Sequence, residues 1–385
     1  MTKSNKKTPK IFVWSYLENY RKNKKKILNL VDKVFQSGSL VLSNEVANFE
    51  NNFSKFTNNK YGVGVNSGTD ALRIALMAAG IKKDDEIITV SNTAVPTVCA
   101  IVECGAKPIF IDVNEKDFLI DASKIEEKIN KKTKAIIPVN LYGQSADYEK
   151  INKIAKKFDL KVIEDCAQSA GSLYKGKPSG SHGDLAAFSF YPTKILGAYG
   201  DGGFLTTNNK KLFEKMHRFR FYGIDTLGVN KKWKNKYYSI DQGMNSRLNE
   251  VQSAILNLKL KKLPESIKRR REIAKKYFEG LKNTSLELPI VNNNNFHVFH
   301  IFEIAHLKRD LIIRKMKNRK INLGIHYKYP IHTMKGYRSL NNKKNLLKET
   351  EKKAKKIFSL PIYPLLKNNE VKIIIKNLKA IISKI

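Results

Sequence analysis

Lys194 differs from most other lysines of this chain in its neighbours. It lies in the stretch 188–203, which reads Phe-Ser-Phe-Tyr-Pro-Thr-Lys-Ile-Leu-Gly-Ala-Tyr-Gly-Asp-Gly-Gly, whereas the other lysines mostly lie in polar runs. Burial among aromatic and small residues lowers the pKa of a lysine amine, which suits the amine to bonding with a carbonyl or to proton transfer. Two interpretations are open: a reactive amine, or a buried stem whose ammonium reaches solvent beside a glycine-rich turn.

Asp165 is the second candidate, because it follows directly on the apolar strand predicted over 161–164. A carboxylate at that place needs a positive or hydrogen-bonding partner. It could cap the following helix, or it could bind a protonated pyridine nitrogen and hold it charged, so that the ring acts as an electron sink. Lys194 follows 29 residues later, after a loop and a predicted strand at 186–190, so a common pocket is geometrically reasonable.

A third candidate is the turn Asn66-Ser-Gly-Thr, which leads from a short strand into a predicted helix. Ser67 and Asp70 have the spacing of a capping box, which sets where the helix begins. Free backbone N–H groups and hydroxyls at such a start form a phosphate site. An ordinary capped helix explains the same local pattern.

The elements that would position these residues alternate between short β-branched runs and segments long enough for helical crossovers. This alternation predicts a largely parallel sheet covered by helices, with ligands beyond the carboxyl ends of the strands. The predicted strands are 86–90, 107–112, 135–139 and 161–164, and the segments of interest that follow strands are 91–97, 140–144 and 165–169.

Beyond the sheet, the sequence predicts a long helix that starts in the segment from Gly243 and runs toward Leu281, with a kink at Pro264. The last hundred residues mix short strands with helices and predict a smaller α+β domain. We therefore divide the chain into an N-terminal segment with a large domain, 1–265, and a small C-terminal domain, 266–385. Further predicted elements are helices at 44–57, 210–221, 309–319 and 344–358 and a strand at 298–304.

The chain of 385 residues is 42% hydrophobic, enough for a substantial core, and carries a formal net charge of +37. Its lysines are scattered and accompany many asparagines, which favours a compositional drift; attraction of an anionic substrate, or of nucleic acid, stays open. Three cysteines without Cys-x-x-Cys spacing or nearby histidines favour a reducing, cytoplasmic location and no metal site. No apolar run approaches the roughly 18 residues of a membrane span.

Taken in order, the motifs resemble the DegT/DnrJ/EryC1/StrS family of sugar aminotransferases along nearly the whole chain. Each motif is weak alone, but the ordered set is specific. The set comprises Val13-Trp-Ser-Tyr-Leu, the stretch Ser37-Gly-Ser-Leu-Val-Leu-Ser-Asn-Glu, Asn66-Ser-Gly-Thr-Asp-Ala-Leu, Gly105-Ala-Lys-Pro, Glu164-Asp-Cys-Ala-Gln-Ser, Ser189-Phe-Tyr-Pro-Thr-Lys, Gly243-Met-Asn-Ser-Arg-Leu-Asn-Glu-Val-Gln, His297-Val-Phe-His and Leu360-Pro-Ile-Tyr-Pro.

The resemblance implies the fold-type I α/β scaffold and pyridoxal phosphate as cofactor, with pyridoxamine phosphate as its intermediate form. Lys194 would bind the cofactor covalently and later move a proton between the cofactor and the sugar carbon. Related dehydratases have histidine in place of this lysine. The other implied contacts are Asp165 to the ring nitrogen, Gln168 to the ring and its phenolic oxygen, Gly68, Thr69 and Ser189 to the phosphate, and Asn245 from the second subunit of a homodimer.

One position departs from the family pattern. Many relatives carry an aromatic residue that stacks on the cofactor ring where this chain has Ala94, so either Ala94 and Val95 cover the ring or an aromatic side chain comes from elsewhere. The glycines around Lys194 are expected to leave space for the ring and a sugar. His326, Tyr327 and His332 lie in a segment that approaches the active site in relatives. Each is also a credible packing residue, so they are not included in the catalytic set.

The resemblance implies transfer of an amino group from L-glutamate to a keto-sugar nucleotide. The segments 92–97, 220–223 and 237–239 followed by 243–252 are most similar to the enzymes that act at C-3 of dTDP-3-keto-6-deoxyhexoses. Relatives that act at C-4 more often have histidine where Tyr222 stands. Two alternatives are kept: a 4-aminotransferase of a 4-keto-6-deoxyhexose, and, more remotely, a basic nucleic-acid-binding regulator on the same scaffold.

Overall fold

The computed structural model describes residues 10–233, 236–340 and 347–385, and its centre is one mixed sheet in the order β1-β9-β8-β5-β4-β2-β3. Strands β3, β2, β4, β5 and β8 are parallel, and β9 runs antiparallel to both β8 and β1. The predicted, largely parallel sheet is therefore confirmed. The strands are β1 (Tyr61–Val65), β2 (Glu86–Val90), β3 (Lys107–Ile111), β4 (Thr133–Ile136), β5 (Lys161–Asp165), β8 (Leu185–Ser189) and β9 (Gly203–Thr207).

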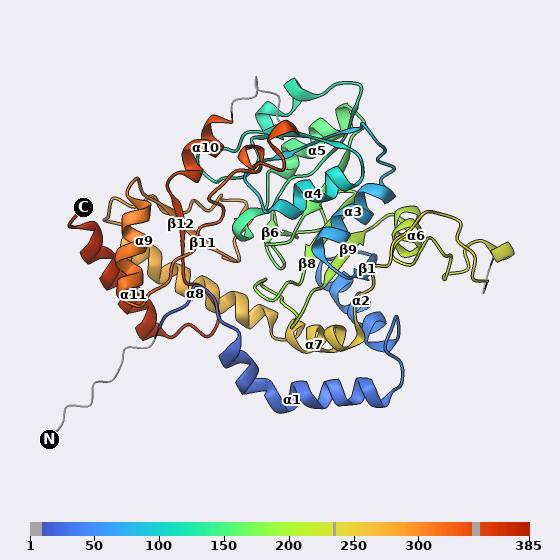
Figure 1. Cartoon of the computed structure of the whole chain (residues 1–385), viewed down its shortest axis with the longest axis horizontal. Helices are drawn as coiled ribbons and strands as arrows, with labels where there is room; N and C mark the ends of the chain where they lie inside the picture. Colours follow the sequence, from blue (N-terminus) through green and yellow to red (C-terminus); the bar gives the residue numbers. More distant parts are fainter. Residues whose placement is uncertain (1–9, 234–235, 341–346) are drawn as a thin grey trace.

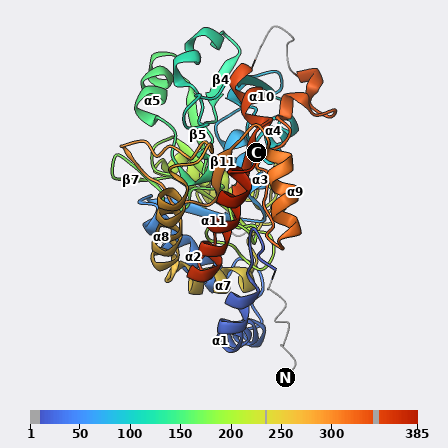
Figure 2. The ribbon, with the colours of Figure 1, turned by 90° about the vertical axis from the view of Figure 1, so that its left-hand side faces the viewer.

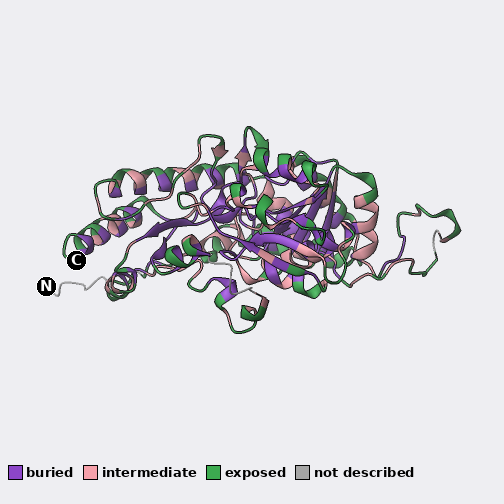
Figure 3. Ribbon diagram, turned by 90° about the horizontal axis from the view of Figure 1, so that it is seen from above, coloured by how far each residue is buried: buried purple, intermediate pink, exposed green. Residues whose placement is uncertain are grey.

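Helices cover both faces of this sheet, so its strands are apolar on both sides. Successive side chains of a strand point to opposite faces, and Ile87 accordingly packs in one core with Ile74 while Ile88 packs in another with Ile151. Figure 3 shows the buried strands at the centre, with exposed residues on the outer helices. The helices of this part are α1 (Leu17–Gln36), α2 (Asn44–Phe56), α3 (Gly68–Ala78), α4 (Val95–Glu103), α5 (Tyr148–Lys157), α6 (Lys210–Phe219) and α7 (Glu250–Leu260).

An aromatic core supports the strand that leads to Lys194. Phe53 of α2 lies edge-on to Phe188 of β8, with ring centroids 5.0 Å apart, and to Phe190 just beyond it, at 5.2 Å. Edge-to-face pairs of buried aromatic rings each add about 0.5–1.5 kcal/mol beyond the burial of their area. The end of β8 is thereby held rigidly under the loop that carries the lysine.

The C-terminal part of the chain has a core of its own, formed by residues from Ile273 to Ile382 together with Ile11. Figure 2 faces this part and shows α8 and α9 on either side of α11, which contacts both helices. The predicted boundary at 265/266 falls inside α8, and the division stays a prediction. The elements here are α8 (Leu263–Leu281), β11 (Phe302–Ala305), α9 (Arg309–Asn318), α10 (Lys348–Ala354), β12 (Ile357–Leu360) and α11 (Asn368–Ile382); a small sheet joins β6 (Leu173–Tyr174), β7 (Lys177–Pro178) and β10 (Asn295–Phe296).

Three predicted elements were wrong in their extent. The long helix from Gly243 is two helices, because Pro264 lies in the first turn of α8, where its missing N–H breaks no helical hydrogen bond. The helix predicted at 344–358 is shorter: α10 ends at Ala354 and the chain pairs with β11 from Ile357, while 344–346 lie outside the described residues. The strand predicted at 298–304 begins only at Phe302.

Within the part of the chain that the structure describes, no helix combines the length and apolar character needed to cross a bilayer.

Candidate active site

Six of the seven predicted site residues line one cavity of about 310 Å³. They come from separate segments: the start of α3, the end of β5 and the turn after it, the end of β8, and the loop that follows β8. The cavity thus lies at the carboxyl ends of neighbouring parallel strands, where the alternation of strands and helices predicted a ligand site. The six are Gly68, Thr69, Asp165, Gln168, Ser189 and Lys194; Asn245 is exposed and does not line the cavity.

The start of α3 forms one end of the cavity. The Oγ of Ser67 accepts a hydrogen bond from the backbone N–H of Asp70 at 3.1 Å, as predicted. The carboxylate of Asp70 accepts from the Ser246 hydroxyl at 2.6 Å, so the structure shows one half of the capping box and a contact that fixes the segment beside Asn245. The first turn of a helix offers free N–H groups and the positive end of the helix dipole, which bind a phosphate.

Two glycines allow the chain to close around this helix start. A Cβ on Gly68 would lie 2.6 Å from the Cβ of Ser189, and one on Gly203 would lie 2.1 Å from the carbonyl oxygen of Ser67. The first contact would push the start of α3 away from β8, and the second would push it away from β9. The expectation that the glycines near Lys194 leave space for ligands was therefore wrong for Gly203. This residue makes a close backbone contact with Ser67, where the end of β1 pairs with the start of β9.

Asp165 is almost fully buried at the end of β5. Its Oδ2 accepts from the hydroxyl of Thr97 at 2.8 Å and its Oδ1 from the backbone N–H of Ala167 at 3.1 Å. Burial raises the pKa of Asp165, while the two hydrogen bonds and the charge of Lys194 partly oppose that shift. A cationic ring nitrogen placed against this carboxyl group would favour its ionised form and so oppose the effect of burial.

Lys194 is half-buried, and its pKa is lowered because the surrounding protein removes water from the amine; the charge of Asp165 acts against this effect. The neutral amine is the form that bonds to a carbonyl or accepts a proton. Of the two interpretations of Lys194, the structure therefore supports the reactive amine.

The side wall of the cavity is mostly small and apolar. Ala94 lines it together with Pro96 and Leu72, whereas Val95, the other residue considered for the ring face, does not. Among the described residues that line this cavity, Tyr191 is the aromatic one. It lies three residues before Lys194, within the stretch 188–203.

Two residues left out of the catalytic set lie beside Lys194. His326 and Tyr327 line a smaller cavity of about 130 Å³ that also contains Lys194. Gln168 connects the two cavities, because its Nε2 donates to the Tyr327 hydroxyl at 3.0 Å. Periodicity and spacing could not have found them, since they lie more than 130 residues from Lys194 in the sequence. The buried His332 instead contacts Ser91, with 2.6 Å between Nδ1 and Oγ.

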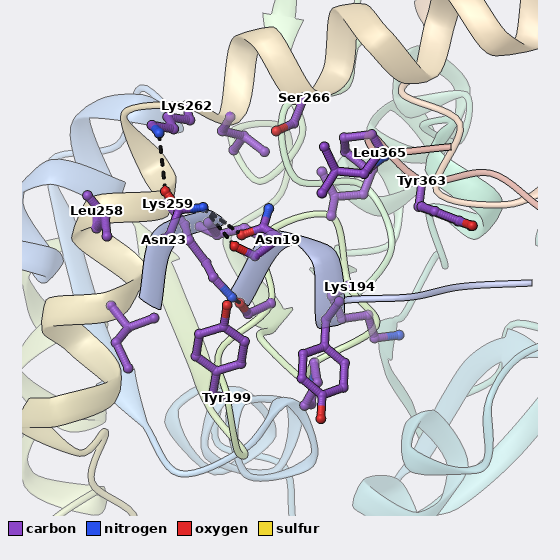
Figure 4. A pocket seen from close by; sticks show the side chains of 18 of the residues that line it. Asn19, Asn23, Lys194, Tyr199, Leu258, Lys259, Lys262, Ser266, Tyr363 and Leu365 are labelled. Atoms are coloured by element: carbon purple, nitrogen blue, oxygen red, sulfur yellow. Dashed lines mark hydrogen bonds between the residues drawn. The ribbon is translucent and has the colours of Figure 1, made fainter. Parts of the chain in front are cut away.

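A third cavity, of about 470 Å³, lies on the other side of the Lys194 stem and is lined by α1, α7 and α8 (Figure 4). Lys259 donates to the carbonyl oxygen of Gly197 at 2.6 Å and lies over the ring of Tyr199; burial lowers the pKa of Lys259 to about 8. Figure 4 shows the Lys194 amine directed away from Lys259. Because this cavity contains neither Asp165 nor the start of α3, the 310 Å³ cavity is the candidate active site.

The donor groups of the 310 Å³ cavity fit a cofactor that has a phosphate, a basic ring nitrogen and an aldehyde. The helix start fits the phosphate, the buried carboxyl fits the nitrogen, and the amine fits the aldehyde. Among the residues described here, no group of three or more histidine, cysteine, aspartate or glutamate side chains could hold a metal ion.

Comparison with protein families matches residues 21–379 to the DegT/DnrJ/EryC1/StrS aminotransferase family. The chain belongs to this family. It is 42% identical to a dTDP-3-amino-3,4,6-trideoxy-alpha-D-glucose transaminase of Micromonospora megalomicea over 97% of this chain and 99% of that protein. It is also 42% identical to a dTDP-3-amino-3,6-dideoxy-alpha-D-galactopyranose transaminase of Aneurinibacillus thermoaerophilus, over 91% and 94%.

Solved structures of the same fold agree with this aminotransferase assignment. The structure of S. venezuelae DesV in complex with a ketimine intermediate superposes with a TM-score of 0.92 at 32% identity, covering 97% of this chain and 98% of that one. NtdA from Bacillus subtilis with bound cofactor PMP gives a TM-score of 0.89 at 29% identity, covering 99% and 87%. The fold expected from the resemblance is confirmed.

Proposed function

We propose that this aminotransferase moves an amino group from L-glutamate to a nucleotide-linked keto-sugar, with dTDP-3-keto-6-deoxyhexose as the acceptor and dTDP-3-amino-3,6-dideoxyhexose as the product. The observation that carries this proposal is the meeting of an amine, a buried carboxyl and a phosphate-binding helix start in one cavity. The full-length similarity to two dTDP-3-amino-sugar transaminases supports the choice of substrate. The retained lysine, aspartate and helix start argue against a nucleic-acid-binding regulator.

Pyridoxal phosphate, when bound, supplies a ring that takes up the electrons released from the carbon attached to nitrogen. Gly68, Thr69 and Ser189 would hold its phosphate, and Asp165, oriented by the hydroxyl of Thr97, would keep the ring nitrogen charged. Lys194 would hold the cofactor through its aldehyde, and its amine would accept and return the proton at the reacting carbon. Ala94 and Pro96 exclude water from one wall of the cavity.

The sugar position is tested by offering the purified enzyme, with L-glutamate, a 3-keto and a 4-keto nucleotide-linked 6-deoxyhexose. We expect an amino sugar from the 3-keto substrate, with kcat/KM at least about 10²-fold higher than for the 4-keto compound, because a displaced carbonyl loses the positioning that makes the reaction effectively intramolecular. Mass spectrometry of the product measures this. Product from the 4-keto compound alone would contradict the C-3 assignment.

We also propose a homodimer in which Asn245 reaches the phosphate of the neighbouring active site. The exposed Asn245 is held in place by its neighbour Ser246, which bonds to Asp70 at the start of α3. Between α6 and α7, the described residues 220–233 and 236–249 extend away from the body of the chain (Figure 1). They expose Val229 and Tyr237, the latter at 86% of its full surface. Exposed apolar residues on such an extension fit burial against a second copy.

Mixing two defective variants tests whether Asn245 acts across the dimer. We expect Asn245→Ala and Lys194→Ala each to be defective. An equal mixture of the two, unfolded and refolded together, should recover about a quarter of wild-type activity. Random pairing makes half of the dimers mixed, and each mixed dimer has one intact site of its two. Steady-state rates measure the recovery. Activity no greater than the mean of the two separate variants would place Asn245 and Lys194 in the same subunit's site or outside it.

A further inference from the structure

A row of three hydrogen-bonded side chains ends at the cavity that Lys194 shares with His326. Glu303 of β11 and Ser359 of β12 stand opposite each other in the strand pair. The hydroxyl of Ser359 donates to Glu303 Oε2 at 2.6 Å. The Oγ of Ser359 also lies 2.7 Å from Nδ1 of His326. Every link is short enough for a proton to move along it.

The inner end of this row is shielded from water. Glu303 is 3% exposed and Ser359 is 1% exposed, and the second carboxyl oxygen of Glu303 has no hydrogen-bond partner among the described residues. Burial raises the pKa of Glu303 well above its ordinary value, with Ser359 and the charge of Arg309 acting against the shift. Glu303 can therefore take up a proton at a pH where an exposed glutamate cannot.

The outer end of the row lies next to the reactive amine. The cavity that contains both His326 and Lys194 has about 130 Å³, room for on the order of four water molecules. Burial and the charge of Lys194 lower the pKa of His326 to about 4, so the imidazole is neutral at neutral pH. In a neutral imidazole one ring nitrogen is a donor and the other an acceptor.

The serine hydroxyl has one proton, and this limits the row to two arrangements. With Glu303 ionised, Ser359 donates to Glu303 and accepts from Nδ1–H of His326, which leaves Nε2 as a proton acceptor. With Glu303 protonated, each hydrogen bond reverses and Nε2 carries a proton. The two arrangements differ by one proton on the whole row.

We propose that Glu303, Ser359 and His326 form a proton relay that accepts a proton from the Lys194 cavity and stores it on Glu303. A proton that arrives at Nε2 of His326 is matched by transfer of the Nδ1 proton to Ser359 and of the Ser359 proton to Glu303. No electrons move, and the negative charge of Glu303 is neutralised. Within the proposed transamination, on which this role rests, the relay lets Lys194 return to its neutral form; Glu303 and Ser359 are positioning residues.

Other ionisable groups face the relay and would contribute to its pH dependence. They come from the loop of Lys194, the segment after β4, the segments on either side of β11, and the segment of His326 itself. These groups are Lys194, Tyr142, His300, Arg309 and Tyr327.

The tautomer of His326 tests the relay without any reaction. In protein labelled with ¹⁵N-histidine, the His326 ring is assigned with His326→Gln among the seven histidines. It is expected to change from Nε2–H to Nδ1–H as the pH rises through the raised pKa of Glu303. Glu303→Gln is expected to abolish the change. Glu351→Gln is the control, because Glu351, His332 and Ser91 form a similar row away from Lys194. A constant tautomer in wild type, or an unchanged transition in Glu303→Gln, would overturn the proposal.

The rate of the half-reaction with L-glutamate, followed by cofactor absorbance, tests the role of the relay. We expect Ser359→Ala to lower kcat by about 10²-fold with little change in KM, as for loss of a proton-transfer partner, and Ser359→Thr to keep most of the rate. An equal loss in both variants, or a change confined to KM, would contradict a relay. If wild type does not react with L-glutamate, the proposed donor is wrong, and the tautomer measurement still decides the relay.

Discussion

Lys194→Ala is expected to abolish transamination, with a loss of about 10⁴-fold or more. General acid–base transfer by one side chain accounts for up to about 10⁴-fold, and this variant also loses the covalent anchor for the cofactor. The amine lies where the 310 Å³ and 130 Å³ cavities meet, with a pKa lowered by burial. Single-turnover absorbance with L-glutamate measures the effect directly.

Lys259→Met is the matched control for this experiment. Lys259 is also a half-buried lysine with a lowered pKa, but it lines the 470 Å³ cavity, away from Asp165, and donates to the carbonyl oxygen of Gly197. We expect its half-reaction with L-glutamate to stay within about 3-fold of wild type, since its ammonium does not face Asp165. A Lys194→Ala protein that still turned over, with the fold unchanged by circular dichroism, would refute the proposed mechanism.

Asp165→Asn is expected to lower kcat by about 10²- to 10³-fold, as for removal of one preorganised electrostatic partner at a reacting centre. The amide is the same size as the carboxylate and can still accept from the backbone N–H of Ala167, so positioning is retained while the charge opposite the ring nitrogen is lost. Thr97→Val, which removes the hydroxyl that orients Asp165, is expected to give a smaller loss. Equal rates for Asp165→Asn and wild type would remove Asp165 from the mechanism.

The same substitution is expected to stabilise the cofactor-free protein at neutral pH. Burial raises the folded-state pKa of Asp165 above its unfolded value of 3.8, so the folded protein holds the proton more tightly than the unfolded chain. The resulting stabilisation is fully present below pH 3.8 and is lost as the pH rises through the folded pKa. Asparagine is neutral throughout, so the Tm of Asp165→Asn should exceed that of wild type at pH 7, and the difference should shrink on acidification.

A lower Tm for Asp165→Asn at pH 7 would mean that the hydrogen bonds from Thr97 and Ala167 outweigh the cost of burying the charge. Adding pyridoxal phosphate separates the two contributions. A bound cationic ring nitrogen stabilises the charged carboxylate, so the cofactor should raise the Tm of wild type more than that of the variant.

The parts of the site that lie close together in the sequence could be predicted from it. Ser67-Gly-Thr-Asp indicates a helix start by its chemistry, and the apolar run before Asp165 indicates the end of a strand. These signals arise from local backbone geometry and from the burial of short β-branched segments, which depend on neighbours a few residues away. The ordered family motifs added the prediction of pyridoxal phosphate as cofactor. The family match and the PMP-bound structure of NtdA support that prediction.

Contacts between distant segments required the tertiary structure. The sequence has no periodicity that links His326 or Ser359 to Lys194, because segments more than 130 residues apart meet only when β11 and β12 pack beside the main sheet. The close contact of Gly203 with Ser67 likewise follows from the pairing of β1 with β9.

The sequence by itself therefore predicted Lys194, Asp165 and the turn before α3 as candidate site residues, since each candidate depends on residue type and local order. The tertiary structure decided which side chains surround the amine, how far burial shifts its pKa, and which buried groups can exchange protons with it. Desolvation and hydrogen bonding depend on what folding brings within a few ångströms, and sequence spacing does not record that distance.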